Sequence, residues 1–349
     1  MFMNSDNAGP AHPRVMAAVA RENEGWQGSY GADDAMARVT AAVRELFEAP
    51  EAAVYLVATG TAANVLALAT LTQPFQTIFC PPTAHIQEDE CNAPEFFTGG
   101  AKLTLVGQSD KLETAPLRAA IEGEEVRGVH GPQRGPVSLT QSTELGRVYT
   151  TGEIEAVCAV AREYGLPVYL DGARFANALV SLNCSPAEMT WRAGVDAVSL
   201  GGTKNGCLGV EAVVLFDPAK AWEFELRRKR GAHLFSKHRF LSAQMEAYLD
   251  GGLWLEAARM ANDRCARLAD GLGGLDGVSF LHRPQANALF AYLPRDMHRR
   301  LFAAGAQYHL WGVPDSEMHK DGGPLLSRMV CDWSLPEAEV DRFIDIARG

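Results

Sequence analysis

Two short apolar segments, each ending abruptly in glycine and charge, constrain the fold of this chain more than any other feature. The first is Val168–Leu170, which runs into Asp171-Gly-Ala-Arg174, and the second is Val198–Leu200, which runs into Gly201-Gly-Thr-Lys204. Apolar runs of this kind are typical of buried parallel strands. In open α/β sheets, functional groups gather beyond the carboxyl ends of such strands. We therefore expect Asp171, Arg174 and Lys204 to lie near one edge of a sheet.

The chemistry of these side chains indicates an imine-forming enzyme. A lysine held at a strand end, away from water, can act as an amine nucleophile. An aspartate within reach can keep a heterocyclic nitrogen protonated, as pyridoxal phosphate enzymes require. Lys204 and Asp171 together therefore predict Schiff-base chemistry.

Composition excludes several classes of protein. The net charge is −11, and the densest basic run, Arg227–Arg230, is short enough to be the solvated end of a helix, so we expect no nucleic acid partner. The seven cysteines are scattered and form no C-x-x-C, which predicts a reducing compartment without disulfides or a zinc site. We find neither a signal peptide nor an apolar run long enough to span a membrane, and we expect a cytoplasmic protein without membrane contact.

The order of apolar segments and breakers predicts three parts. Residues 1–35 show little periodicity and read as an arm or loop. Residues 36–250 alternate strands with helices up to residue 216, which predicts a large domain with a mostly parallel sheet and right-handed crossovers. Within it we expect a loop over 123–135, a helix over 151–164 capped by Thr151, and a strand over 211–216 that returns antiparallel or forms an edge. Residues 251–349 predict a smaller α/β domain, which begins with a helix over 253–272.

The small-residue turn Ala58–Asn64 lies between a predicted strand, 52–57, and a helix that runs to Leu71. Free backbone N–H groups and the helix dipole make such a turn, around Gly60 and Thr61, a candidate anion site. The plainer alternative is a turn in which Thr61 only caps the helix. The glycines of a P-loop or a dinucleotide-binding turn are missing, which argues against an NAD dehydrogenase.

His85 follows a predicted strand over 77–80 that ends at two prolines. It is either an ordinary residue at a helix start, with acids in the first turn, or an imidazole placed to pack on a ring or move a proton. A metal site with Glu88 or Asp89 lacks the second histidine of H-E-x-x-H, and we expect no metal.

Taken together, the motifs Ala58-Thr-Gly-Thr-Ala-Ala-Asn64, Ala84-His85, Leu170–Arg174 and Gly202-Thr-Lys204 resemble the low-specificity L-threonine aldolases. These are pyridoxal phosphate enzymes of the aspartate-aminotransferase-like fold (fold type I). The similarity runs from Ser5 to Arg328, and the segments 141–146 and 201–205 resemble a bacterial subgroup that includes enzymes active on phenylserine-type substrates.

The resemblance implies a role for each matching residue. Lys204 would bind the cofactor covalently and Asp171 would pair with its ring nitrogen. His85 would stack on the ring, and Gly60 and Thr61 would bind the phosphate. Thr203 precedes the lysine at a position where serine is frequent, and its hydroxyl can do the same work. Arg174 would bind near the ring oxygen or the substrate carboxylate, and Ser5 and Arg328 would hold that carboxylate. Tyr30 and Lys237 match positions that reach the cofactor of a neighbouring subunit, which implies a homodimer or homotetramer with sites completed across the interface.

One departure leaves the general base open. Where many family members carry a second active-site histidine, this chain has Glu144 and Leu145. The base is then His85, Glu144 or a water bound to the cofactor phosphate.

The implied reaction is cleavage of L-threonine, L-allo-threonine or phenylserine between Cα and Cβ, which yields glycine and an aldehyde. A β-eliminating lyase or an aminotransferase of the same fold is the alternative, because the same cofactor serves several reactions. A non-catalytic binding protein is disfavoured, since Lys204 and Asp171 are both present.

Overall fold

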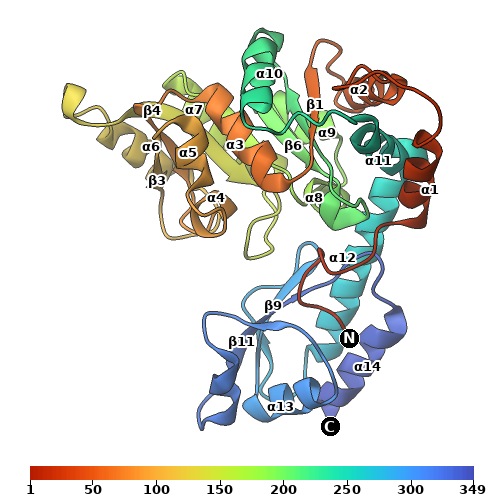
Figure 1. The fold of residues 1–349 in the computed structure, drawn as a ribbon. Helices are drawn as coiled ribbons and strands as arrows, with labels where there is room; N and C mark the ends of the chain where they lie inside the picture. The colour runs from red at the N-terminus through yellow and green to blue at the C-terminus, as the bar shows by residue number, and fades with distance from the viewer.

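The computed structural model describes all 349 residues, which form two sheets joined by a long helix (Figure 1). The strands of the large sheet run in the order β1 (Ala53–Val57), β7 (Glu211–Leu215), β6 (Ala197–Gly201), β5 (Val168–Asp171), β4 (Gln133–Thr140), β2 (Gln76–Cys80) and β3 (Lys102–Leu105). All of these strands are parallel except β7, which is antiparallel to both of its neighbours. The small sheet is antiparallel and has the order β10 (His309–Leu310), β11 (Leu325–Val330), β9 (Ala288–Leu293) and β8 (Ser279–Phe280).

Helices cover both faces of the large sheet because alternate residues of its strands are apolar on both sides. In β1, Tyr55 and Val57 pack on one face and Val54 and Leu56 on the other. The first face is covered by α3 (Gly60–Leu71), α5 (Ala93–Thr98) and α10 (Ala221–Arg230). The second face is covered by α2 (Asp34–Leu46), α6 (Thr114–Gly123), α7 (Thr151–Glu163), α8 (Phe175–Leu182), α9 (Pro186–Met189) and α11 (Arg239–Leu249).

The helix α12 (Leu253–Leu272) has the predicted bounds and belongs to both cores. Its first turns, with Leu253 and Trp254, pack under the large sheet, and its last turns, with Leu268 and Leu272, pack against the small one. The core around the small sheet is completed by α13 (Arg295–Ala303), α14 (Glu337–Arg348) and the buried Met1 and Met3. The domain boundary at residue 250 stays a prediction, because α12 begins just beyond it and packs in the cores of both sheets.

The expected α/β fold, with a large, mostly parallel sheet and a smaller α/β unit, is confirmed. The interpretation of residues 1–35 as a loop was wrong, because α1 (Pro13–Glu22) forms there and packs on α11. Pro13 stands at its first position, where a missing N–H costs nothing, and His12 caps it through its side chain. No helix has the length and apolar character needed to cross a bilayer.

Smaller corrections concern element ends. The caps are Thr59 and Thr150 instead of Thr61 and Thr151, because a cap lies just outside the helix, where its side chain can accept an N–H. Strand β4 begins inside the expected loop, at Gln133, since it pairs with β2. The segment 211–216 is antiparallel as expected, and it lies inside the sheet between β1 and β6.

Candidate active site

A cavity of about 380 Å³ opens at the carboxyl ends of β5 and β6, beside the N-terminus of α3. It is lined by most of the predicted cofactor and catalytic residues: Gly60, Thr61, His85, Glu144, Asp171, Thr203 and Lys204. The predicted residues Ser5, Tyr30, Arg174, Lys237 and Arg328 are not part of its wall. The strand ends therefore bring Asp171 and Lys204 to one hollow, as the sequence predicts.

Two glycines let the ends of β5 and β6 approach closely enough for this. A Cβ on Gly172 would lie 2.0 Å from the carbonyl oxygen of Ser199, and one on Gly201 would lie 2.5 Å from that of Ala173. Any side chain at either position would force the strands apart. Gly172, which follows Asp171, and Gly201, which ends β6 ahead of Lys204, are thus required by the packing of the two strand ends.

Asp171 ends β5 with its carboxylate buried. Its Oδ2 accepts a hydrogen bond from Asn64 Nδ2 at 3.0 Å and its Oδ1 accepts one from the N–H of Ala173 at 2.9 Å. No cationic side chain forms an ion pair with it within the chain. Buried charges are normally paired, so this carboxylate is suited to a positively charged partner that the cavity would admit.

Lys204 lies in a short 3₁₀ turn, Thr203–Asn205, which follows β6 and is held on both sides. Glu211 Oε2 accepts the N–H of Gly202 at 2.9 Å, and Asn205 Nδ2 donates to the carbonyl of Trp254 at 2.8 Å. The amine of Lys204 has no hydrogen-bond or ion-pair partner in the chain and lines the cavity. An unpaired amine on a fixed backbone is well placed to form a covalent bond with a carbonyl ligand.

The start of α3 leaves two backbone N–H groups free at the cavity. Thr59 caps the helix by accepting the N–H of Ala62 at 3.1 Å, whereas the N–H groups of Gly60 and Thr61 have no acceptor within the helix. Both residues line the cavity. Two free N–H groups at the positive end of a helix dipole attract a phosphate.

His85 begins α4 (His85–Glu88) and pairs with a residue that the sequence interpretation missed. Its Nδ1 lies 2.8 Å from Oε1 of Glu90, and this hydrogen bond raises the pKa of the imidazole. The acids considered as metal partners, Glu88 and Asp89, are exposed. No group of three or more His, Cys, Asp or Glu side chains could hold a metal ion.

The N-terminal residues 4–7 lie beside two arginines. Arg174 Nε and Nη2 pair with the buried Asp6 at 2.7 and 2.9 Å, which leaves Asp6 as the counter-charge of this arginine. Arg328 Nη2 donates to the carbonyl of Asn4 at 3.4 Å, and its guanidinium lies 5.0 Å from the ring centroid of Trp311. Its buried Nε has no partner, so Arg328 is the arginine left free for an anionic ligand. Next to Asn4, the hydroxyl of Ser5 accepts the N–H of residue 7.

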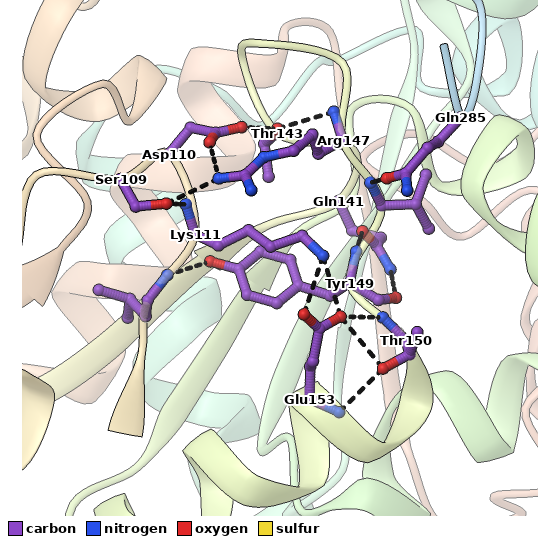
Figure 2. Close-up of polar contacts among 12 residues, drawn as sticks. Ser109, Asp110, Lys111, Gln141, Thr143, Arg147, Tyr149, Thr150, Glu153 and Gln285 are labelled. Carbon is purple, nitrogen blue, oxygen red and sulfur yellow. Dashed lines mark hydrogen bonds and ion pairs between the residues drawn. The ribbon is translucent and has the colours of Figure 1, made fainter. Parts of the chain in front are cut away.

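A polar network fixes the loop that carries Glu144 between β4 and α7 (Figure 2). Asp110 accepts the hydroxyl proton of Thr143 and forms an ion pair with Arg147. The Gln141 side chain bonds both the N–H and the carbonyl of Tyr149, at 3.0 and 2.8 Å. The loop therefore holds Glu144 at the cavity wall on a rigid frame.

The same loop is tied to the connection between β8 and β9 of the small sheet. Gln285 accepts the N–H of Val148 at 2.7 Å, and His282 Nε2 lies 2.6 Å from the carbonyl of Leu145 (Figure 2 includes the first of these). Leu145 and Trp311 both pack against the buried cluster of Ala288, Phe290 and Val330, and the Arg328 guanidinium lies over the Trp311 ring.

Tyr30 and Lys237 lie away from the cavity of their own chain. The N–H of Tyr30 donates to the carbonyl of Ser236 at 3.1 Å, which places the two segments side by side. The amine of Lys229 lies 4.9 Å from the centroid of the Tyr30 ring. Tyr30 and Lys237 are both exposed.

Sequence reasoning missed Asp6, Asn64, Glu90 and Glu211. Asn64 stands in a quoted motif and Glu211 is the one charge at the head of an apolar strand, so both carried a signal. Glu90 is hidden in an acidic run whose other members are exposed, and only its burial separates it from them.

Comparisons with known proteins agree with this geometry. The family model described as beta-eliminating lyase matches residues 3–295. Two curated relatives are low-specificity L-threonine aldolases: one from Pseudomonas aeruginosa, 39% identical over 99% of this chain and 95% of its own, and one from Pseudomonas sp. (strain NCIMB 10558), 38% identical over 96% and 94%.

Solved structures show the same architecture. The Leishmania major threonine aldolase superposes with a TM-score of 0.92 at 26% identity and covers 99% of this chain and 98% of its own. A Sphingomonas wittichii serine palmitoyltransferase has a TM-score of 0.72 at 16% identity, covers 100% and 86%, and shares the fold alone. These matches confirm the aspartate-aminotransferase-like, fold type I architecture. The chain belongs to the β-eliminating lyase family, within which it resembles the low-specificity L-threonine aldolases.

Proposed function

We propose that this protein is a pyridoxal 5'-phosphate-dependent aldolase. It cleaves L-threonine, L-allo-threonine and phenylserine-type β-hydroxy-α-amino acids to glycine and an aldehyde. One observation carries the proposal: an unpaired lysine amine and a buried aspartate without a cationic partner line one cavity, at the open N-terminus of a helix. The names of the two Pseudomonas relatives support it.

The residues of the cavity fit the cofactor. Lys204 would hold it covalently and Asp171 would face its protonated ring nitrogen. The N–H groups of Gly60 and Thr61 would bind its phosphate, with the hydroxyl of Thr203 close by. His85 would contact the ring. When bound, pyridoxal phosphate supplies an electron-accepting ring that stabilises negative charge at the substrate Cα.

The arginine left free for an anion would orient the substrate. Arg328 has a buried Nε without a partner and no carboxylate in the chain to neutralise it, which suits an amino-acid carboxylate. Ser5 would add its hydroxyl, and Arg174, already paired with Asp6, would complete the clamp. Holding the carboxylate selects which bond at Cα is aligned for cleavage.

The assembly is a homodimer or homotetramer whose active sites are completed across the interface. In this proposal Tyr30 and Lys237 act in the neighbouring subunit, since both lie exposed and outside their own cavity. The setting is the cytoplasm, in keeping with seven free cysteines.

The second candidate is another reaction on a small amino acid: β-elimination, which the description of the family model favours, or transamination. Purified holoenzyme given L-threonine, L-allo-threonine or phenylserine separates the two. Glycine and aldehyde in equal amounts support the aldolase, whereas ammonia or a keto acid without glycine supports the alternative. In Lys204→Ala, the cofactor absorption band and its trapping by borohydride should both be lost; a trapped adduct that persists would assign another lysine.

A further inference from the structure

Glu90 is a buried carboxyl that no part of the proposed reaction uses. Its side chain has no solvent exposure and hangs from the connection between α4 and α5. Oε1 accepts two hydrogen bonds, from His85 Nδ1 at 2.8 Å and from Asn64 Nδ2 at 2.7 Å. Oε2 is buried without any partner. Burying a half-satisfied carboxyl costs free energy, so its place has to be explained by what it does for the two donors.

The orientation of Asn64 links Glu90 to the aspartate of the site. Asn64 Oδ1 accepts the hydroxyl proton of Tyr169 at 2.7 Å, and Nδ2 donates to both Glu90 and Asp171, the latter at 3.0 Å. Rotating the amide by half a turn would point its oxygen at two carboxyl groups. One asparagine therefore joins the carboxyl of Glu90 to that of Asp171 in a fixed geometry.

This arrangement determines which nitrogen of His85 carries a proton. Burial raises the pKa of the Glu90 carboxyl, against the lowering effects of its hydrogen bonds with His85 and Asn64. Once ionised, this carboxyl only accepts hydrogen bonds, so Nδ1 then holds a proton toward Glu90 and neutral His85 has a lone pair on Nε2. Nε2 makes no hydrogen bond within the chain, and the ring lines the cavity. The charged groups around the ring are Glu90, Asp171 from β5 and Glu144 from the loop after β4, with Lys204 in the same cavity.

We propose that Glu90 is a positioning residue that holds His85 as the Nδ1–H tautomer and so presents Nε2 as the acceptor of the substrate's β-hydroxyl proton. This inference rests on the aldolase function proposed above. The hydroxyl O–H bond breaks and its proton passes to Nε2, while its electron pair forms the aldehyde C=O. The Cα–Cβ bond breaks at the same time and its electron pair stays with the glycine half. Nε2 then gives up its proton and one proton is delivered to Cα, so glycine is completed with no net change in protons. Carboxyl, imidazole and hydroxyl act in the order known from triads that activate a hydroxyl group.

The test compares holoenzyme variants at Glu90 with a matched control. Glu90→Gln keeps the size and one acceptor but removes the charge, and Glu90→Leu removes the acceptor as well. Glu88→Gln removes an exposed carboxyl from α4, the short helix that begins with His85, and should leave activity unchanged. The cofactor absorption band reports that each variant is folded and loaded. The readouts are the pH profile of kcat with L-threonine and phenylserine, KM, and ¹⁵N NMR of histidine-labelled protein, with His85 assigned from His85→Gln.

We expect wild-type His85 to be protonated on Nδ1 and bare on Nε2 above its titration. Losing the Glu90 charge makes the imidazole a weaker base, so in Glu90→Gln the acid limb of the kcat profile moves to lower pH and the plateau falls. A positioned general base contributes about 10²–10⁴-fold. We therefore expect a loss in kcat of about tenfold or more for Glu90→Gln and about 100-fold or more for Glu90→Leu, with KM and the cofactor band close to wild type.

Two results would overturn the inference: an Nε2–H tautomer of His85 in the wild type, or an acid limb of kcat that stays in place in Glu90→Gln. Failure of the proposed function has a different signature. There the wild type releases no glycine from β-hydroxy amino acids, while the NMR spectra still report which nitrogen of His85 carries the proton beside Glu90.

Discussion

Glu211 offers a stability measurement that tests the electrostatics of the cavity without any substrate. It is the first residue of β7, it is buried, and it lies in the wall of the cavity that holds Lys204. Burial raises the pKa of its carboxyl from 4.5 to about 7, against the lowering effects of the Thr203 and Gly202 hydrogen bonds and the Lys204 charge. Burial is the largest of these effects, so the folded protein holds a proton there that the unfolded chain has already released.

The sign of the pH effect follows from that proton. Below pH 4.5 the carboxyl is neutral in both states and costs nothing. As the pH rises from 4.5 through about 7, the unfolded chain releases its proton first and the folded protein comes to hold a buried charge. The free energy of unfolding therefore falls over this range. Moving a carboxyl pKa from 4.5 to about 7 corresponds to about 3 kcal/mol. For a chain of 349 residues this is worth about 4 °C in melting temperature.

Glu211→Gln makes the neutral state permanent. In calorimetry of cofactor-free protein between pH 4.5 and 8.5, we expect its melting temperature to gain about 4 °C on that of the wild type as the pH rises. Glu51→Gln, at an exposed position before β1, is the control and should track the wild type. A difference that stays constant with pH would refute the reasoning. If the melting temperature of Glu211→Gln instead fell relative to that of the wild type as the pH rises, Lys204 would be holding Glu211 ionised.

Three further outcomes follow from the contacts of the site. Asp171→Ala should keep cofactor bound through Lys204 but lose turnover by about 100-fold or more, because the ring nitrogen loses the carboxylate that keeps it protonated; near-normal kcat in a loaded variant would contradict this. Arg328→Lys should raise KM for L-threonine about tenfold, since an ammonium cannot reproduce the planar fork of a guanidinium; an unchanged KM would place the substrate carboxylate elsewhere. Asp6→Ala should destabilise the protein by about 3–5 kcal/mol, because it leaves Arg174 without its buried partner. Adding Arg174→Met should restore much of that stability, and calorimetry that shows two additive losses would argue against a coupled pair.

Local patterns in the chain were sufficient to predict many of the elements. The helix over 253–272 and the strands that end at Asp171 and before Lys204 depend on residues within one or two turns of each other, so composition and periodicity identify them. Gly172 and Gly201, next to these strand ends, can likewise be recognised from the local sequence alone. The helix α1 within residues 1–35 was missed because it is short and its apolar residues are stabilised by α11, which lies more than 200 residues away in the chain.

The remaining features depend on contacts between distant segments, which local patterns do not specify. An acid at position 6 or 90 looks like any exposed carboxylate until Arg174 or His85 and Asn64 are brought to it. Strand periodicity predicts which face is apolar, but it does not tell whether β7 lies inside the sheet or at its edge. The residues that could form the site were therefore visible in the sequence. Their hydrogen-bond partners and burial were set by tertiary packing, because a side chain's environment is a property of all the segments that surround it.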